Sequence, residues 1–343
     1  MKCVLLGDPI VPSQSMLSIL GRLQTRGVEF LPLDWETGMG LKEFYKLALQ
    51  LESRRPKDLP TEMHKCLAEA EIIVTDYAPV SKGTMELAPK LRLIGCIRGG
   101  TENIDLTEAK RRGITVAHAP GRNSTSVADF TLGLLLALHR HIAAAHCMMK
   151  QGIWNDQWSG PEGLSTELSG KTIGIIGYGA IGRKVALRAK AFEMGILVHD
   201  PYVKIDEKTD GVRAVDLETL LRESDFVTVH VRMSPGNKNL IGEKQLGMMK
   251  RSAYLINTAR APLVDEEALF RALAIGQIQG AALDVFSQEP PPPNFELARL
   301  ENVVLTPHLA GSTVEGELVN GVKMIAEEID RFLACSPLVK TVQ

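Results

Sequence analysis

The segment 171–200 constrains the fold of this chain more than any other stretch. A short β-branched run at 172–176 leads into the glycine-rich sequence GYGAIG at 177–182, and a helical pattern of apolar residues follows. A second apolar run at 196–198 ends at Asp200, which stands 23 residues after the first glycine. A strand, a glycine turn, a helix and a second strand that leads to an acid after about 20 residues are typical of a βαβ unit that binds a dinucleotide.

Each glycine of this turn has a physical role. Gly177 permits the tight turn out of the strand, Gly179 lets the backbone approach a pyrophosphate closely, and Gly182 lets the helix pack against the strand. The helix N-terminus offers free N–H groups and a partial positive charge to the phosphates. The predicted contacts to the cofactor are therefore Gly177, Tyr178, Gly179, Ala180, Ile181, Gly182 and, after the second strand, Asp200.

Asp200 favours NAD over NADP. Its carboxylate can accept hydrogen bonds from a ribose 2′-OH, whereas it would repel a 2′-phosphate. Pro201 and Tyr202 follow, so no arginine stands next to it to bind that phosphate. On the glycine motif alone, a flavin or another nucleotide stays open, as does a chance match.

Length and charge narrow the class of protein. A chain of 343 residues is long enough for two domains. A hydrophobic content of 45% and a charged content of 23% are typical of a soluble globular protein. The net charge of −2 gives no electrostatic reason to expect a nucleic acid or an anionic membrane as partner.

The N-terminus, the short apolar segments and the cysteines are expected features of a cytoplasmic protein. The N-terminus, MKCVLLGDPI, is typical of a first strand and not of a signal peptide. The most apolar helical segment, 132–138, stops at His139 and is too short to cross a bilayer. The five cysteines are scattered without paired spacing, so we expect reduced thiols and no metal site; they are Cys3, Cys66, Cys96, Cys147 and Cys335.

Short apolar runs alternate with helical patterns along most of the chain. Before residue 118 the expected strands are 3–6, 28–33, 72–75, 93–97 and 114–117, and the expected helices are 14–25, 40–49, 61–69, 81–88 and 105–112. From residue 171 the expected strands are 172–176, 196–199, 226–230, 253–257, 278–283 and 303–306. This alternation predicts an α/β fold with two doubly wound parallel sheets, each covered by helices on both faces.

Two long helices are predicted, one before and one after the strands that begin at residue 172. Apolar residues recur at helical spacing from Val127 to Ala145, which predicts one helix over about 124–150 that leads from one domain to the next. The following segment, 154–163, fits no regular element and is interpreted as a loop or as an arm on a partner subunit. An amphipathic pattern over 311–333 predicts the last helix.

Several polar residues follow strands of the second predicted sheet, where ligands bind in parallel α/β folds. They are His230, the run Asn257-Thr258-Ala259-Arg260, the acids Asp284 and Glu289, and His308.

Three of these residues suit reduction of a ketone. The planar guanidinium of Arg260 matches a carboxylate, and His308 can exchange a proton near neutral pH. Glu289 could hydrogen-bond the far nitrogen of that imidazole and favour its charged form. Taken singly, Arg260 could instead form a surface salt bridge, and His308 could be a polar residue that flanks a helix.

The chain resembles the D-isomer-specific 2-hydroxyacid dehydrogenase family. The matching text covers nearly the whole chain: PGRNSTSVADFTLGLLLALHR at 120–140, GYGAIG at 177–182, Asp200, NTARAPLVDE at 257–266, ALDVFSQEP at 282–290 and TPHLAG at 306–311. The resemblance implies that Arg260, Glu289 and His308 form a catalytic triad. It also implies cofactor contacts at His230, Val231, Thr258, Ala259 and Asp284, with Asp284 near the nicotinamide amide.

The resemblance further implies the domain organisation. A flavodoxin-like substrate-binding domain would consist of 1–117 and 309–343, and a Rossmann NAD-binding domain would span 118–308. Substrate would bind in the cleft between them, held by the loop Arg98-Gly99-Gly100 together with Arg260 and His308. Members are commonly homodimers held by the linking helix and arm, here 124–163.

Some positions depart from the family pattern. The substrate loop RGGTENID is about two residues shorter than the common form. Ala261 stands where glycine is usual, Arg232 stands where proline is common, and Asn237 replaces a common threonine. These departures leave the triad intact and put the substrate and the details of the cofactor loop in question.

The substrate is therefore open. Arg98, Arg122 and Arg232 fall in loops expected near the cleft, where at least one could bind a second anion such as a phosphate; contact with solvent or with the NAD phosphates is the alternative. Glu289 argues against a formate dehydrogenase-like member, which carries an amide there. The resemblance implies an NAD-dependent D-2-hydroxyacid dehydrogenase that acts on a small 2-hydroxy or 2-keto acid.

Within this reaction class, a phosphoglycerate dehydrogenase-like activity is the first expectation. A hydroxypyruvate or glyoxylate reductase, or a sugar-acid dehydrogenase, is the alternative. From a different class, an NAD(H)-sensing protein similar to the family's transcriptional corepressors also stays open, and enzymatic turnover would distinguish it from an enzyme.

Overall fold

The computed structural model describes residues 1–36, 38–40, 43–44, 59–154, 156–158, 163–206, 208 and 211–342. Contacts divide the chain into unit 1, which holds Met1–Asn123 and Ser312–Gln343, and unit 2, which holds Ser124–Gly311. The expected boundaries lay at 117 and 308. The predicted helix at 40–49 falls mostly outside the described residues, and the predicted arm at 154–163 does so in part.

Unit 1 is built on a parallel sheet with the strand order β2-β1-β3-β4-β5. Its strands are β1 (Lys2–Gly7), β2 (Glu29–Asp34), β3 (Ile72–Thr75), β4 (Leu93–Cys96) and β5 (Thr115–His118). All five strand predictions are confirmed to within one or two residues at either end. This strand order is that of flavodoxin-like folds.

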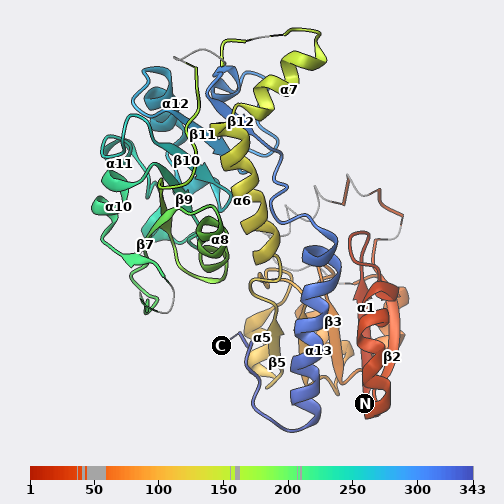
Figure 1. Cartoon of the computed structure of the whole chain (residues 1–343). Helices are drawn as coiled ribbons and strands as arrows, with labels where there is room; N and C mark the ends of the chain where they lie inside the picture. Colours follow the sequence, from red (N-terminus) through yellow and green to blue (C-terminus); the bar gives the residue numbers. More distant parts are fainter. Residues whose placement is uncertain are drawn as a thin grey trace. The chain divides into compact units, whose positions relative to one another are not determined.

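Helices cover both faces of this sheet. They are α1 (Ser13–Leu20), η1 (Gly21–Arg26), η2 (Thr61–Met63), α3 (His64–Leu67), α4 (Lys82–Leu87), α5 (Leu106–Arg111), the π-helical turn η6 (Glu315–Val319) and α13 (Asn320–Leu333). Figure 1 shows α13 beside α1, and both contribute to the same buried apolar cluster with β1 and β4. The helices α3, α4 and α5 pack in the cluster on the other face.

Unit 2 contains a seven-stranded parallel sheet with the order β12-β11-β10-β9-β6-β7-β8. Its strands are β6 (Thr172–Ile176), β7 (Gly195–His199), β8 (Arg213–Ala214), β9 (Phe226–Val229), β10 (Tyr254–Asn257), β11 (Gly280–Leu283) and β12 (Val303–Leu305). The first strand, β6, lies beside β9, where the strand order reverses as in Rossmann folds. The sequence did not predict β8, which is two exposed residues long.

The helices of unit 2 also form two layers. They are α6 (Ser124–His139), α7 (Ile142–Lys150), α8 (Ala180–Ala191), α10 (Leu217–Glu223), η3 (Pro235–Asn237), α11 (Glu243–Leu246), η4 (Ala261–Leu263), α12 (Glu266–Ala274) and η5 (Glu296–Arg299). One buried cluster contains residues of α6 and α8, and the other contains residues of α10, α11 and α12. Figure 1 shows these two groups on opposite faces of the sheet.

The prediction of one helix over 124–150 is wrong. Two helices, α6 and α7, occupy this stretch with a bend of 66° between them. His141 lies at the break with φ = 56°, a left-handed conformation that does not continue a right-handed helix. Leu134 and Leu138 are buried as expected, but Ile142 is 55% exposed, and no described residue of α7 is buried. The buried face therefore ends with α6.

The last helix also differs from its prediction. The pattern at 311–333 predicted one helix, whereas α13 begins at Asn320 and follows the separate turn η6. The chain then returns to the edge of the sheet, where Thr341 pairs with Ala117 in an antiparallel bridge and Val342 N donates to Val116 O over 2.9 Å. The buried carboxylate of Glu328 fixes this end by accepting a hydrogen bond from Val339 N over 2.8 Å.

Among the described helices, no single one is both long and apolar enough to cross a membrane. The helices α6 and α7 meet that criterion only when they are taken together across their bend.

Candidate active site

The glycine turn of unit 2 leaves a helix N-terminus open for phosphate. Gly177 follows β6 with φ = 95°, and a Cβ atom there would lie 2.7 Å from the backbone of His230. A Cβ atom on Gly182 would lie 2.1 Å from Gly177 O, whereas one on Gly179 would meet no atom within 4 Å among the described residues. The N-cap residue of α8 is Gly179, which has no side chain to cap the helix. Its first N–H groups and the open space beside Gly179 fit the pyrophosphate of a dinucleotide.

Asp200 is held beside this turn. It follows β7, and its Oδ2 accepts a hydrogen bond from Tyr178 N over 2.8 Å. Its Oδ1 accepts hydrogen bonds from Tyr202 N and Val203 N, over 2.9 and 3.1 Å. A carboxylate has about four lone-pair sites, so Asp200 retains acceptor capacity for ribose hydroxyls.

The other expected cofactor contacts follow β9 and β10. His230 and Val231 come directly after β9, and His230 Nε2 lies 2.9 Å from Thr228 Oγ1. Burial lowers the pKa of His230 to about 3, so its imidazole is neutral at pH 7. Thr258, after β10, is buried with Oγ1 3.0 Å from Thr131 Oγ1 of α6.

His308 and Glu289 form the closest pair of ionisable groups at this edge. His308 follows β12, and its Nδ1 lies 2.7 Å from Glu289 Oε2. Glu289 Oε1 accepts a hydrogen bond from Phe286 N over 3.0 Å, which fixes the carboxylate. Because Nδ1 is used by Glu289, the opposite nitrogen, Nε2, is the one that can exchange a proton with a substrate.

The pair is tuned toward its charged form. The hydrogen bond that His308 donates to Glu289 raises the pKa of His308 above its usual range, although burial and the nearby Arg260 oppose this shift. Burial alone would raise the pKa of Glu289, but the hydrogen bonds from His308 and Phe286 N lower it overall. His308 therefore stays protonated to a higher pH than a free histidine.

Arg260 brings a positive charge to the same pair. It follows β10, is exposed, and donates from Nη1 to Ala259 O over 2.8 Å. Its charge lowers the pKa of both His308 and Glu289, so the guanidinium lies within electrostatic range of both. The three residues expected to act together thus lie within electrostatic range of one another.

Asp284 has contacts that the sequence did not reveal. Its carboxylate is fully buried and accepts hydrogen bonds from Thr306 Oγ1, Leu309 N and Ala310 N, over 2.6, 2.8 and 2.8 Å. These three donors stand on both sides of His308, which has φ = 55°. Asp284 therefore holds the turn that carries His308. Thr306 was missed as a site residue, and its only signal is its place in the TPH sequence.

The expected substrate loop belongs to unit 1 and follows β4. Arg98 is 6% exposed, donates from Nη2 to Glu102 Oε2 over 2.9 Å, and lies 3.8 Å from the centre of the Tyr77 ring. Gly99 O lies 2.9 Å from His118 Nδ1, and Gly100 O accepts a weak hydrogen bond from Cys96 Sγ over 3.3 Å. The loop is fixed by its own unit.

The two other arginines considered for a second anion, Arg122 and Arg232, differ in exposure and in their unit. Arg122 lies in unit 1, has a side chain that is 9% exposed, and donates to Gly316 O, Glu317 O and Glu317 Oε2, over 2.8, 2.9 and 2.7 Å. Arg232 is exposed in unit 2. Arg122, like Arg98, is therefore already paired with an acid of its own unit.

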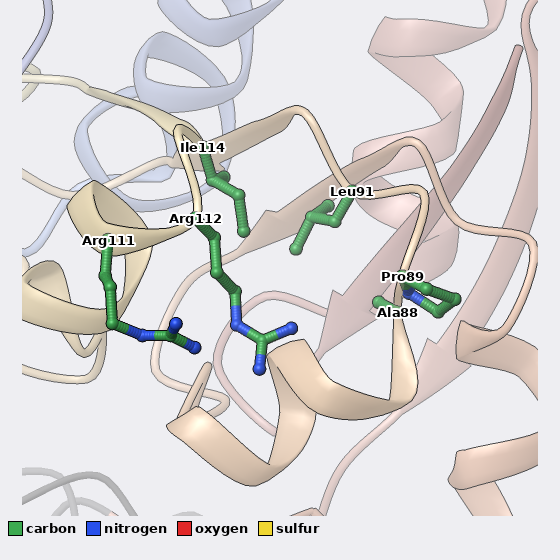
Figure 2. Close-up of a pocket in the computed structure, with 6 residues that line it drawn as sticks. All are labelled: Ala88, Pro89, Leu91, Arg111, Arg112 and Ile114. Carbon is green, nitrogen blue, oxygen red and sulfur yellow. The ribbon is translucent and has the colours of Figure 1, made fainter.

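A separate hollow of about 330 Å³ lies in unit 1, and Figure 2 shows its lining: Ala88, Pro89, Leu91, Arg111, Arg112 and Ile114. Both arginines donate to Glu108, over 2.6 to 2.8 Å, which lowers the pKa of that acid to about 2. Glu86 also lies 3.8 Å from Arg112, so the two acids offset the charge of the two arginines. Among the described residues, no group of three or more His, Cys, Asp or Glu is placed to hold a metal ion.

Comparison with known proteins identifies the family of this chain. Residues 132–310 match the family model described as D-isomer specific 2-hydroxyacid dehydrogenase, NAD binding domain. The chain belongs to the D-isomer-specific 2-hydroxyacid dehydrogenase family. It is therefore an oxidoreductase that uses NAD, with the Rossmann-type cofactor domain expected from its glycine motif.

Relatives agree with this assignment. A glyoxylate reductase of Thermofilum pendens is 46% identical over 233 residues, which are 67% of this chain and 69% of that protein. A D-3-phosphoglycerate dehydrogenase of Methanocaldococcus jannaschii is 41% identical over 79% of this chain and 51% of its own length. The crystal structure of D-lactate dehydrogenase with NAD+ from Lactobacillus jensenii is 25% identical and covers both chains fully with a TM-score of 0.79. The chain is an NAD-dependent D-2-hydroxyacid dehydrogenase.

Proposed function

We propose that Arg260, Glu289 and His308 carry out the proton transfer and substrate anchoring of this dehydrogenase. The observation that supports this most directly is the 2.7 Å hydrogen bond between His308 Nδ1 and Glu289 Oε2 next to the charge of Arg260. The three groups meet the needs of a 2-keto acid, which presents one carboxylate and one carbonyl oxygen.

The residues divide the work of the reaction. Bound NADH supplies the hydride to the carbonyl carbon. His308 Nε2 gives its proton to the carbonyl oxygen, so that no free alkoxide accumulates, and the same nitrogen removes that proton in the reverse direction. Glu289 stabilises the imidazolium and fixes the ring. The Arg260 guanidinium holds the carboxylate in a bidentate manner and polarises the ketone.

The cofactor contacts are proposed along the edge of unit 2. The glycine turn from Gly177 to Gly182 would hold the pyrophosphate, and Asp200 would bind the ribose hydroxyls. The other proposed contacts are His230, Val231, Thr258, Ala259 and Asp284. For Asp284 the support is its place beside His308. Its oxygens accept three hydrogen bonds from the turn that carries His308.

Unit 1 is proposed to be the substrate-binding domain. The loop Arg98-Gly99-Gly100 would offer backbone N–H groups to the substrate carboxylate. Its support is the position of this loop after β4, at the carboxyl edge of a parallel sheet where ligands bind.

The substrate is proposed to be a small 2-keto acid, reduced to the D-2-hydroxy acid. A phosphorylated substrate, the first expectation from sequence, is compatible with the phosphoglycerate dehydrogenase relatives. The relatives named glyoxylate and hydroxypyruvate reductase support an unphosphorylated one. The internal pairing of Arg98 and Arg122 favours this second class, because neither guanidinium lacks a carboxylate partner.

A cytoplasmic homodimer is proposed as the working form. The exposed apolar residues of α7 and the segment after it support an interface there; they are Ile142 at 55%, Met149 at 54%, Ile153 at 47% and Trp154 at 83% exposure. A patch of this kind is typical of a protein interface. The cytoplasmic location is supported by the five cysteines, which are all free thiols.

The test is NADH oxidation, followed at 340 nm, across glyoxylate, pyruvate, hydroxypyruvate and 3-phosphohydroxypyruvate, with NADPH in parallel. We expect turnover with NADH of at least one acid and little turnover with NADPH. NADH binding without turnover of any of the four acids would contradict the proposal and favour the NAD(H)-sensing alternative.

A further inference from the structure

Asp76 lies beside the proposed substrate loop within unit 1. It follows β3 directly, and the parallel register pairs Thr75 of β3 with Cys96 of β4. The ladder continues one step further, where Ile97 N donates to Thr75 O over 2.9 Å. Asp76 is therefore next to Ile97 at the carboxyl edge of the sheet, one residue from Arg98.

The carboxylate of Asp76 is buried without a hydrogen bond. Asp76 is 0% exposed, and neither Oδ1 nor Oδ2 has a hydrogen-bond partner among the described residues. Asn103 Nδ2 donates over 3.0 Å to the backbone oxygen of Asp76 and not to its side chain. An unsatisfied buried carboxylate is costly and rare, so its presence at a ligand-binding edge points to a partner that arrives with a ligand.

The neighbouring carboxylate, Asp8, is used differently. Its Oδ1 accepts hydrogen bonds from Ile10 N and Val11 N, over 2.9 and 3.0 Å, and its Oδ2 accepts one from Tyr77 N over 3.0 Å. Asp8 thus braces the loops that follow β1 and β3. Of these two buried aspartates, only Asp76 keeps its acceptor sites unfilled within the described part of the chain.

The charges around Asp76 exclude an anion. Arg98 and Arg122 both act on Asp76 electrostatically, but Glu102 and Glu317 already neutralise them. With Asp8, the group holds four carboxyls and two guanidiniums. Burial, together with Asp8, raises the pKa of Asp76 to about 8 in spite of the two arginines. A phosphate placed here would meet an excess of negative charge.

A cationic ligand group gains little from Asp76 near neutral pH. Because its pKa is raised to about 8, the acid is mostly protonated at pH 7 and offers no full negative charge to an ammonium. A neutral O–H group fits the acid in either state. It can donate to Asp76 when the acid is ionised, and it can accept from Asp76 when the acid is protonated.

We propose that Asp76 is a specificity-determining residue that hydrogen-bonds a hydroxyl on the substrate carbon next to the keto group. The preferred substrates are then unphosphorylated 2-keto acids with a hydroxylated third carbon, an inference that rests on the proposed function in 2-keto acid reduction. This proposal replaces the phosphate-binding role considered for Arg98 and Arg122 with a hydroxyl-binding role for Asp76.

Binding to the NADH-loaded enzyme tests this without turnover, because hydroxy acids cannot be oxidised when the cofactor is already reduced. D-glycerate, D-lactate and 3-phospho-D-glycerate differ only at the third carbon, which carries a hydroxyl, no oxygen or a phosphate. By titration calorimetry above the raised pKa of Asp76, where the acid is ionised, we expect D-glycerate to bind wild-type protein about tenfold more tightly than D-lactate, as a hydrogen bond to a charged group provides. 3-phospho-D-glycerate should bind more weakly than D-glycerate.

The variants assign the effect to Asp76. In Asp76→Ala the preference for D-glycerate over D-lactate should disappear, while D-lactate binds as in wild type. Glu102→Gln removes another carboxylate of the group, one that is already paired with Arg98, and should keep the preference. An unchanged preference in Asp76→Ala, or equal binding of D-glycerate and D-lactate by wild type, overturns the proposal.

A second variant covers loss of folding in Asp76→Ala. Asp76→Asn keeps an acceptor oxygen and removes the charge, so above the raised pKa of Asp76 it should bind 3-phospho-D-glycerate about tenfold more tightly than wild type does. No gain overturns the proposal. Glyoxylate has no third carbon, so its reduction tests the proposed function independently of Asp76. If wild type does not reduce glyoxylate, the proposed function fails, whereas the inference about Asp76 is tested by the binding preferences alone.

Discussion

The buried carboxylate of Asp284 holds the backbone on both sides of His308. It binds Thr306 Oγ1 two residues before the histidine, and Leu309 N and Ala310 N just after it. His308 adopts φ = 55°, a conformation that non-glycine residues seldom take unless surrounding contacts impose it. The position of the proton donor thus depends on an acid that is 24 residues away in the sequence.

Asp284→Asn is expected to slow the reaction and to destabilise unit 2. An amide would turn an NH₂ group toward one of the three donors, which should cost about 1–3 kcal/mol in the free energy of unfolding. We expect kcat for glyoxylate to fall about tenfold or more, because His308 loses its fixed position. Kinetics and thermal melting measure both effects.

Asp265→Asn is the matched control. Asp265 caps α12 by accepting a hydrogen bond from Ala268 N, and asparagine caps a helix about as well as aspartate. Wild-type kcat in Asp284→Asn would show that the turn does not depend on this carboxylate.

Glu289→Gln is expected to shift the pH dependence of the reaction. Reduction needs protonated His308, so kcat/KM for a keto acid should stay level below the pKa of His308 and decline above it. Glu289 raises that pKa, so the variant should begin its decline at a lower pH than wild type. In the oxidation direction, which needs neutral His308, activity should rise at a lower pH in the variant. Coincident pH profiles would contradict the role of Glu289.

Gly182 and Gly179 give a matched pair for the cofactor turn. Gly182→Ala would place a Cβ atom 2.1 Å from Gly177 O, so it should lower the melting temperature and weaken NADH binding. Gly179→Ala meets no described atom within 4 Å, so it should melt like wild type and still bind NADH more weakly, because the methyl group occupies the pyrophosphate space. Fluorescence titration with NADH measures both. Wild-type affinity in Gly179→Ala would place the phosphates elsewhere.

Ile142→Glu tests the proposed dimer. A charge on the exposed apolar surface of α7 should convert the dimer to a monomer in light scattering coupled to size exclusion. Leu187→Glu on α8 is the control, since Leu187 is 68% exposed and lies outside the proposed interface. A monomeric wild type, or equal masses for wild type and Ile142→Glu, would contradict this interface.

The fold was largely predictable from the sequence because its strands are short, apolar and bounded by turns. The predictions for β3 and β6 match to the residue, since both are buried β-branched runs. The strand β8 escaped because two exposed residues, Arg213 and Ala214, carry no periodic signal. The break between α6 and α7 escaped for another reason: the apolar spacing continues through His141, although the backbone there is left-handed.

The candidate site was predictable only as a set of residue types at strand ends. The sequence suggested His308, Glu289 and Arg260, but it carried no sign that Asp284 braces the turn of His308. It also suggested Arg98 and Arg122 as anion binders, whereas long-range contacts pair Arg122 with Glu317 almost two hundred positions away. Such partners are set by tertiary packing, which local patterns do not record.

The most direct test of the account is the turnover of His308→Gln with glyoxylate, measured together with its affinity for NADH. If His308 is the proton donor, kcat should fall roughly 10²–10⁴-fold while NADH binds as in wild type. Turnover near the wild-type rate, with NADH bound, would contradict the central claim and require another proton donor.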